Sequence, residues 1–196
     1  AVLAGFAELV AGRGADAADM VRRAGIPAHA LVERDMLVSW HALGNLMELA
    51  AVELETPSLG LAWALAVPTP FLNFGPLGLL ARFSETIGQW CAISRSYWRF
   101  HTNAYAVSLM EAESGQDMIL RLAVDDMVPP SRHQMEYTLA GVCQLMRMLA
   151  PIDDSRFVGV RFQHLKPDDL VLHGQAFRCP VEFGCRHNEL VYRREV

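Results

Sequence analysis

The chain has 196 residues, of which 52% are hydrophobic and 20% are charged, and this composition excludes a disordered tail or a low-complexity linker. Its 17 basic and 22 acidic side chains give a formal net charge of −5, which disfavours binding to a nucleic-acid phosphate backbone. The four cysteines are too few and too scattered for a disulfide framework, so we expect reduced thiols in a cytoplasmic protein.

The first 66 residues are predicted to be helical. Asp16 is placed to cap a short helix that stops at Gly25. A longer helix follows, because apolar residues recur at helical spacing up to Thr56-Pro57-Ser58. Its apolar positions are Trp40, Leu43, Met47, Ala50 and Leu54.

An almost entirely apolar segment, residues 59–83, has the length of a membrane span. Pro68, Pro70, Asn73 and Pro76 interrupt it, and lipid offers no partners for the backbone groups that such breaks expose. We therefore expect a buried helix, an irregular proline-rich crossing and the start of another helix, with no membrane contact.

The next helix is expected to open at Ser84 and Glu85 and to run to residue 101. Its apolar stripe contains Ile87, Trp90, Cys91, Ser94, Tyr97, Trp98 and His101. Its solvent-facing side contains Glu85, Gln89, Arg95 and Arg99. After this helix the hydrophobic period changes from 3.6 residues to 2, which predicts strands.

The second half is predicted to combine short strands with one long amphipathic helix. Alternating runs at 105–110 and 118–124, joined by a glycine-containing turn, predict a β-hairpin. The long helix starts at Pro129-Pro130-Ser131. Further strands are expected at 157–163, 181–183 and 190–192, and a short helix is expected at 167–177.

We therefore predict an α+β fold, in which a helical N-terminal third packs on a small, mostly antiparallel sheet with one long amphipathic helix. Residues 1–196 are expected to form a single domain, with a helical subregion at 1–66 and an α+β core at 74–196.

No catalytic or metal-binding pattern stands out in the sequence. It contains no Walker loop, no His-Glu-x-x-His motif and no Gly-x-Ser-x-Gly elbow. Cys179, Cys185 and His187 lack the paired spacing and the fourth ligand of a zinc site. The acidic pairs Asp125-Asp126 and Asp153-Asp154 are expected to cap elements. We expect no catalytic residue, no metal and no cofactor.

Aromatic side chains are concentrated between residues 63 and 105. They fill cores by default, and the alternative is that some of them line an apolar pocket between the helix ending at residue 101 and the sheet. The candidate ligand-binding residues are Trp90, Tyr97, His101, Tyr105 and Tyr137, with Arg121 as a further contact if it faces inward. Such a pocket suits a small, largely apolar molecule with one carboxylate or hydroxyl. Periodicity alone leaves both interpretations open.

The C-terminal third carries an ordered series of motifs. The series reads V-x-F-x-H-x-x-P at 160–167, F-x-C-P-V-x-F at 177–183 and N-x-L-x-Y at 188–192. It resembles the N-terminal, arabinose-binding-like (non-cupin) domain of AraC-type bacterial transcription regulators. The segment that begins at Ser84 resembles a further part of this domain, with Glu85 in place of the usual proline. Within the series, His164 is expected at a strand-to-helix junction, and Asn188 at a turn position with positive φ.

The resemblance implies an effector-sensing and dimerising module. In such regulators a helix-turn-helix domain follows the sensor. The expected partners are therefore a small-molecule effector, a second copy in a homodimer, and DNA only through that C-terminal domain, which is absent from this chain. Two alternatives stay open: a pure oligomerisation module without a ligand, and a small stand-alone enzyme.

Overall fold

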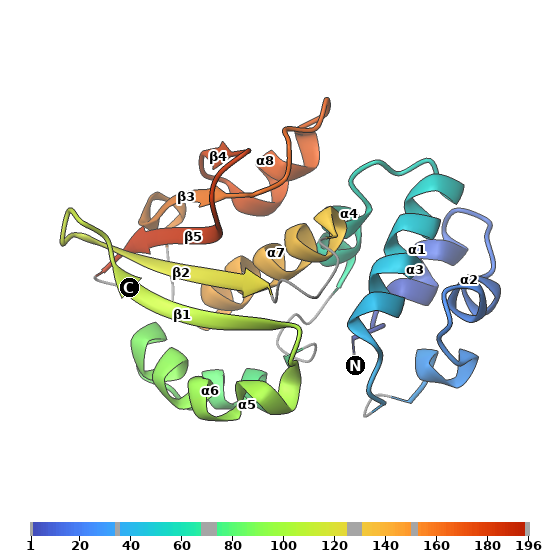
Figure 1. Ribbon diagram of the computed structural model, residues 1–196, viewed down its shortest axis with the longest axis horizontal. Helices are drawn as coiled ribbons and strands as arrows, with labels where there is room; N and C mark the ends of the chain where they lie inside the picture. The colour runs from blue at the N-terminus through green and yellow to red at the C-terminus, as the bar shows by residue number, and fades with distance from the viewer. Residues whose placement is uncertain (1, 34–35, 68–73, 125–130, 150–152, 195–196) are drawn as a thin grey trace.

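The computed structural model describes residues 2–33, 36–67, 74–124, 131–149 and 153–194. The N-terminal helices are α1 (Phe6–Ala11), α2 (Ala17–Arg23), the 3-10 helix η1 (Ala28–Leu31), α3 (Trp40–Glu53) and α4 (Leu59–Ala66). They are followed by α5 (Pro76–Arg82), α6 (Ile87–His101), β1 (Tyr105–Glu111), β2 (Asp117–Val124) and α7 (Arg132–Leu149). The chain continues with the 3-10 helix η3 (Asp154–Arg156), β3 (Phe157–Arg161), α8 (Val171–Phe177), β4 (Val181–Glu182) and β5 (Asn188–Arg193). Figure 1 shows the first helices as one lobe, beside a second lobe that contains the sheet.

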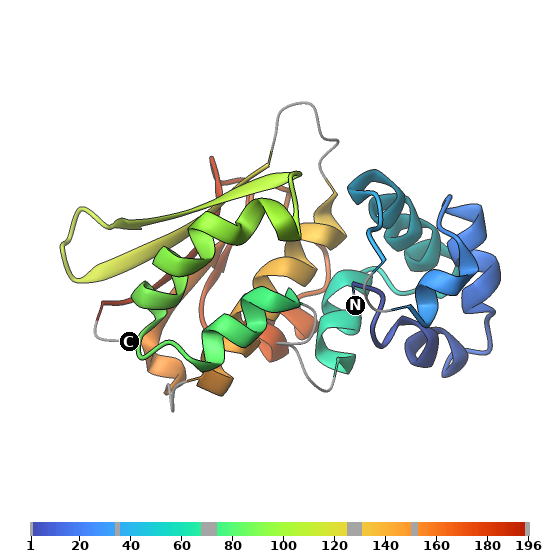
Figure 2. The same ribbon diagram turned by 90° about the horizontal axis from the view of Figure 1, so that it is seen from below.

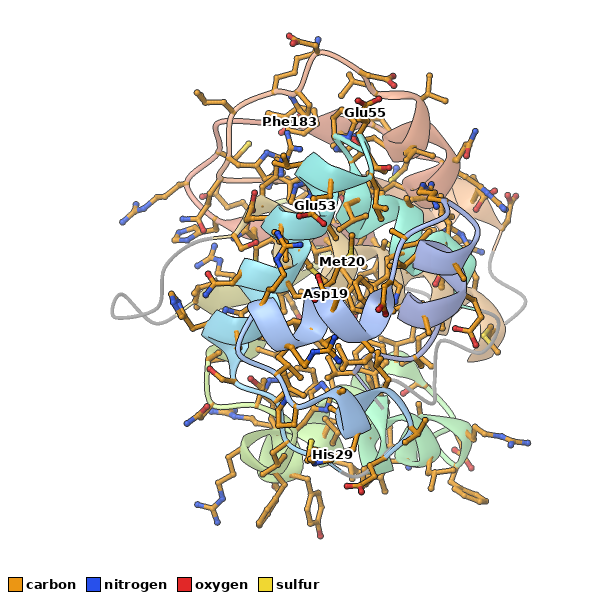
Figure 3. The ribbon with its side chains drawn as sticks, turned by 90° about the vertical axis from the view of Figure 1, so that its right-hand side faces the viewer. Asp19, Met20, His29, Glu53, Glu55 and Phe183 are labelled. Carbon is orange, nitrogen blue, oxygen red and sulfur yellow. The ribbon has the colours of Figure 1, made fainter. Side chains whose placement is uncertain are left out.

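The helical lobe begins as its sequence predicts. Asp16 caps α2, because its carboxylate accepts hydrogen bonds from the backbone N–H groups of Ala18 at 2.8 Å and Asp19 at 3.3 Å. Arg23 at the end of α2 pairs with Asp19 of the same helix and with Glu53 of α3. Figure 3 labels these two acidic residues. Exposed ion pairs of this kind add little stability, so the lobe depends mainly on its buried apolar faces.

Among the described residues, five strands form one mixed sheet in the order β1-β2-β5-β3-β4. β1 and β2 are an antiparallel hairpin, and Gly115 in its turn has a φ of +67°, which glycine adopts without strain. β5 pairs antiparallel with both β2 and β3, whereas β3 and β4 are parallel. The predicted α+β class and the mostly antiparallel pairing are therefore confirmed.

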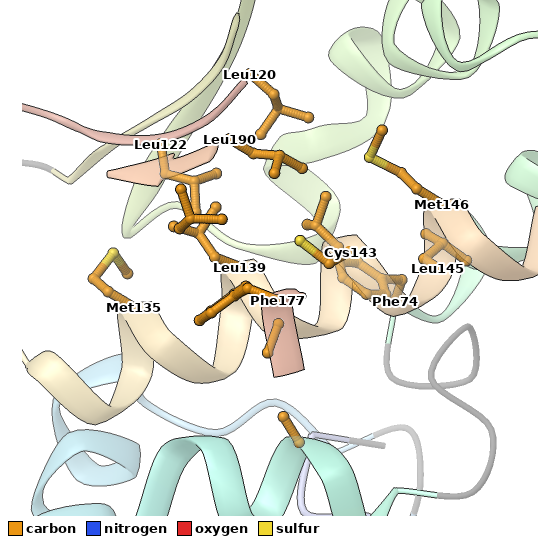
Figure 4. Packing of buried hydrophobic residues seen from close by; sticks show 14 of the residues in the cluster. Phe74, Leu120, Leu122, Met135, Leu139, Cys143, Leu145, Met146, Phe177 and Leu190 are labelled. Atoms are coloured by element: carbon orange, nitrogen blue, oxygen red, sulfur yellow. The ribbon is translucent and has the colours of Figure 1, made fainter. Parts of the chain in front are cut away.

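The long helix α7 covers one face of this sheet. Its Leu139 and Cys143 are fully buried beneath Leu120 of β2 and Leu190 of β5 (Figure 4). These residues come from alternating positions of the strands and from one stripe of the helix, which is the pattern that the sequence predicted.

The helix α4 joins the two lobes. Its Leu59 and Trp63 belong to the apolar cluster of the N-terminal helices, whereas Leu61 belongs to the cluster beneath the sheet. α4 lies so close to α7 that a Cβ atom added to Gly60 would be 2.1 Å from the backbone oxygen of His133. Only glycine fits at this crossing.

Several local predictions differ from the structure. The strand expected at 157–163 ends at Arg161. The short helix expected at 167–177 begins at Val171, whose N–H donates to the Asp169 carboxylate at 2.9 Å. The helix α6 begins at Ile87, later than the predicted start at Ser84, because the Thr86 hydroxyl caps it by accepting from the Gln89 N–H at 3.0 Å. Asn188 is a buried residue of β5 and has no positive φ.

The Asn188 side chain explains its position in the motif series. Its oxygen accepts from the backbone N–H of Gln163 at 3.0 Å, and its amide group donates to the Gln163 side-chain oxygen at 2.7 Å. It therefore satisfies polar groups just beyond the end of β3, which is a role in strand pairing and not in a turn. The predicted proline-rich crossing at 68–73, the pair Asp125-Asp126 and the start of the long helix at Pro129-Pro130 lie outside the described residues.

Candidate functional site

A cleft of about 820 Å³ opens between α6 and the β1–β2 hairpin. Figures 1 and 2 show α6 lying along the β1 edge of the sheet, with α5 beside it. The volume falls within the range of small-molecule sites, roughly 300–1,000 Å³. The residues that line it include Trp90, Cys91, Ser94, Arg95, Trp98 and Arg99 of α6, Tyr105, Val107, Ser108 and Leu109 of β1, and Leu120 and Leu122 of β2.

The sheet side of the cleft is apolar. Val107 and Leu109 of β1 lie at alternate positions, so both side chains leave the same face of the strand. Leu120 and Leu122 of β2 continue this surface, since they pair with Leu109 and Val107 across the hairpin. A ligand with an apolar body gains free energy by covering this wall.

Two residues on the helix side of the cleft each contain a buried hydrogen-bonding atom that has no partner in the described part of the chain. Ser94 is 3% exposed and Trp98 is 8% exposed. Neither the Ser94 Oγ nor the Trp98 Nε1 makes a hydrogen bond within the described part of the chain. The two residues are four apart on α6, so they lie one turn above the other on the same face. Buried polar groups normally have a partner, and a bound ligand is one explanation for such an exception.

The charged side chains of the cleft are all basic. Arg95 and Arg99 of α6 line it, and its lining contains no aspartate or glutamate among the described residues. Within the same residues no carboxylate pairs with either arginine, and Arg99 instead lies 5.5 Å from the centre of the Phe100 ring. Arg121, considered as an inward contact, is paired with Glu189 at 2.7 Å and does not line the cleft.

A second cavity, of about 60 Å³, lies between α7 and the N-terminal helices. It brings together three of the residues predicted from the sequence, His101, Tyr105 and Tyr137. Burial lowers the pKa of His101 below its ordinary value of 6.5 and raises the pKa of the Tyr105 hydroxyl, so both groups are neutral at pH 7. The space suits a few water molecules and is too small for a drug-sized ligand.

The five predicted site residues are therefore divided between different surroundings. Trp90 lines the large cleft, and Tyr105 lines both spaces. Tyr97 was expected beside Trp90 and His101, but it is 51% exposed and lines neither cavity. Tyr97 lies at one margin of the buried face of α6, whereas the cleft follows the opposite margin, where Arg95 lies.

Two features of the sequence point to the cleft, although neither identifies it alone. Ser94 is a polar residue inside an apolar stripe, and this position indicates a specific partner. Arg95 and Arg99 were assigned to the solvent-facing side, because nothing in the helix itself shows that β1 passes beside them.

A separate polar cluster is buried beneath the sheet. Glu136 of α7 has no exposed surface, and its Oε1 lies 3.0 Å from His173 Nε2 and 3.5 Å from His164 Nε2. His133 Nδ1 and Arg132 Nε lie 3.9 Å and 3.8 Å from the same carboxylate. Burial is the main cause that lowers the pKa values of His133 and His164. The cluster joins α7 to α8 and to the segment after β3. Its Glu136 Oε2, His164 Nε2 and His173 Nδ1 atoms are also buried without a hydrogen-bond partner among the described residues, but the residues of the cluster do not line the large cleft.

This cluster and the cysteines do not form a metal site. Within the described residues, no group of histidine, cysteine, aspartate or glutamate side chains is arranged to hold a metal ion. His164 lies in the segment between β3 and α8, with its Nδ1 2.9 Å from the Leu165 oxygen, and not directly at a strand-to-helix junction as predicted.

Two of the cysteine thiols lack the lowered pKa of a nucleophile. The four cysteines are free. Burial raises the pKa of the Cys91 thiol to about 12 and that of Cys179 to about 11, so both remain protonated and unreactive at neutral pH.

The fold and the cleft thus describe an α+β domain with a lined cleft between α6 and the β1–β2 hairpin. The family described as "Arabinose-binding domain of AraC transcription regulator, N-term" matches residues 14–196, and the chain belongs to this family. The resemblance seen in the sequence is therefore confirmed. The proteins of this family are transcription regulators.

The chain also resembles one regulator in sequence and another in fold. The chain is 26% identical over 183 residues to the HTH-type transcriptional regulator VirS of Mycobacterium tuberculosis, in strains CDC 1551 / Oshkosh and ATCC 25618 / H37Rv, covering 92% of this chain and 52% of that protein. Its fold is similar to the crystal structure of the transcriptional regulator CdpR from Pseudomonas aeruginosa, with a TM-score of 0.59, 14% identity, and coverage of 90% of this chain and 54% of the other. The chain thus spans about half the length of these relatives.

In the part of the chain that the structure describes, every helix is too short or too polar to cross a bilayer.

Proposed function

We propose that this chain is the effector-sensing and dimerising part of an AraC-type transcription regulator, and that its effector occupies the cleft between α6 and the β1–β2 hairpin. The observation that supports this most is the pair of unpartnered groups, Ser94 Oγ and Trp98 Nε1, buried in the wall of a cleft of about 820 Å³. A domain evolved only for packing would be expected to satisfy or remove such groups. We further propose that the whole protein acts in the cytoplasm and contacts DNA through a helix-turn-helix part that lies outside this chain.

The assignment of the effector to this cleft is tested with Nile red, an uncharged apolar dye that fluoresces when it leaves water. We expect the purified chain to bind the dye. Val107→Trp places a large ring in the cleft and is expected to weaken dye binding at least tenfold. Met110→Trp is the matched control, because Met110 lies on the same strand but does not line the cleft. Equal dye binding by the Val107→Trp and Met110→Trp variants would contradict the assignment.

The proposed dimer surface is the outer side of α5 and α6. Five large apolar side chains are exposed there, and they are Leu79, Phe83, Ile93, Tyr97 and Phe100. On α6 their spacing of four and three residues places the last three along one line. Soluble monomers seldom leave a large apolar patch uncovered, and two-fold pairing is the commonest way to cover one. We propose that a second copy of the chain covers this surface.

Sedimentation velocity tests the dimer independently of the ligand. We expect the chain to sediment as a dimer at tens of micromolar, and Phe100→Glu to shift it to monomer, because a carboxylate would be buried at the interface. Leu165→Glu is the control, since Leu165 is exposed in the segment between β3 and α8. A monomeric wild-type chain, or an unchanged dimer in Phe100→Glu, would contradict this surface. Dimerisation without Nile red binding would favour the alternative of a pure oligomerisation module.

A further inference from the structure

We infer that the cleft between α6 and the β1–β2 hairpin recognises a carboxylic acid with an otherwise apolar body. This inference rests on the proposed function, and it names the chemical class of the ligand. Three features of the cleft support it: the sign of its charges, the hydrogen-bonding groups on one wall, and the apolar character of the other wall.

The charges of the cleft select an anion. Arg95 and Arg99 line it without a partner carboxylate in the described chain, and its lining holds no acidic side chain there. This local excess of positive charge occurs in a chain whose formal net charge is −5. A cleft lined by one sign of charge concentrates ligands of the opposite sign. Arginine also presents a planar fork of N–H donors that matches the two oxygens of a carboxylate.

The unpartnered groups require an acceptor. The indole N–H of Trp98 can only donate a hydrogen bond, and the Ser94 hydroxyl can donate one. Ser94 precedes Arg95 in the chain, and Trp98 precedes Arg99. The second pair lies about one helical turn after the first on α6. The side chains of Ser94, Arg95, Trp98 and Arg99 therefore place donors on the α6 wall of the cleft, where the oxygens of a carboxylate would supply acceptors.

The wall formed by the β1–β2 hairpin disfavours a ligand with polar groups on every side. Val107, Leu109, Leu120 and Leu122 offer no hydrogen-bonding side chain. A sugar would bury hydroxyl groups against these side chains without a partner, which is unfavourable. A hydrocarbon chain or an aromatic ring is favoured at the same place. The two walls together fit a molecule with an acidic edge and an apolar face.

The experiment compares decanoate with 1-decanol, which has the same carbon chain and no charge, by displacement of Nile red from the purified chain. Arabinose serves as the polar comparison. We expect decanoate to bind at least tenfold more tightly than decanol, and arabinose not to displace the dye. In the double variant Arg95→Gln/Arg99→Gln this preference is expected to fall below twofold, while decanol binds as before.

A second double variant controls for the loss of overall charge. Arg22→Gln/Arg186→Gln removes the same two charges from exposed positions that do not line the cleft, and it is expected to keep the preference for decanoate. Equal binding of decanoate and decanol by the wild-type chain would overturn the inference while leaving the effector site in place. An unchanged preference in Arg95→Gln/Arg99→Gln would also overturn it. Failure of the chain to bind Nile red at all would instead remove the proposed site.

Discussion

The two tryptophans on the inner face of α6 differ in one respect that unfolding experiments can measure. The Trp90 indole N–H donates to the Leu77 oxygen at 2.9 Å, which ties α6 to α5, whereas the Trp98 N–H has no partner in the described structure. Both side chains are buried. Replacing each by phenylalanine removes the same ring atoms, so the loss of packing is shared and largely cancels when the two variants are compared.

The difference between the variants follows from the hydrogen bonds. Trp90→Phe loses one made hydrogen bond, worth about 0.5–1.5 kcal/mol, whereas Trp98→Phe removes a buried unsatisfied donor and relieves about 1–3 kcal/mol. Trp90→Phe is therefore expected to be less stable than Trp98→Phe by about 1.5–4.5 kcal/mol. For a chain of this length the difference corresponds to at least about 3 °C in Tm.

Urea unfolding followed by far-ultraviolet circular dichroism measures this difference without relying on tryptophan fluorescence. Tyr97→Phe is the control and is expected to change stability by less than about 0.5 kcal/mol, because the Tyr97 side chain is half exposed. If Trp98→Phe lost as much stability as Trp90→Phe, the N–H of Trp98 would have a partner in solution, and the argument for an unsatisfied donor in the cleft would fail.

Two further predictions concern the contact between α4 and α7 and the buried histidines near Glu136. Gly60→Ala places a methyl group against the backbone oxygen of His133, which cannot move aside as a flexible side chain could. We therefore expect the free energy of unfolding to fall by more than the roughly 1–3 kcal/mol typical of overpacking. Gly174→Ala in α8 is its control and should stabilise by about 0.5–1 kcal/mol, since the added methyl group meets nothing within 4 Å; similar losses in both would refute the close α4–α7 contact. The second prediction concerns pH: burial holds the pKa values of His133 and His164 below 6.5, so the unfolded chain takes up protons that the folded chain resists. This contribution to stability is complete above pH 6.5 and is lost as the pH falls towards the folded-state pKa values. Urea midpoints between pH 7.5 and 5 should fall less steeply in His164→Gln than in the wild type, and an equal slope would contradict the assignment.

The strands and the long helix were predictable from local patterns. The change of hydrophobic period after residue 101 located the β1–β2 hairpin, and the stripe that includes Met135 and Leu139 located α7. Each of these elements buries one face, so its apolar residues recur in the sequence with the period of a helix or a strand.

The cleft was less predictable because it depends on how elements meet. The apolar face of α6 has one margin at Tyr97 and another at Arg95. Only the placement of α5 and β1 decides that Tyr97 is exposed while Arg95 borders the cleft. The partners of Glu136 come from α7 itself and from residues 164 and 173, so no local pattern reveals that cluster. The turn propensity of asparagine predicted a turn at Asn188. In the structure its hydrogen bond to Gln163 places it in a strand instead.

The most direct test of an effector site on α6 is a nuclear magnetic resonance titration of the ¹⁵N-labelled chain with decanoate. The indole N–H signals of Trp90 and Trp98 are assigned from their phenylalanine variants. The account predicts that the Trp98 signal shifts downfield as its N–H gains an acceptor, while the Trp90 signal, already bonded to the Leu77 oxygen, changes little. A Trp98 signal that stays in place while decanoate binds would contradict the account.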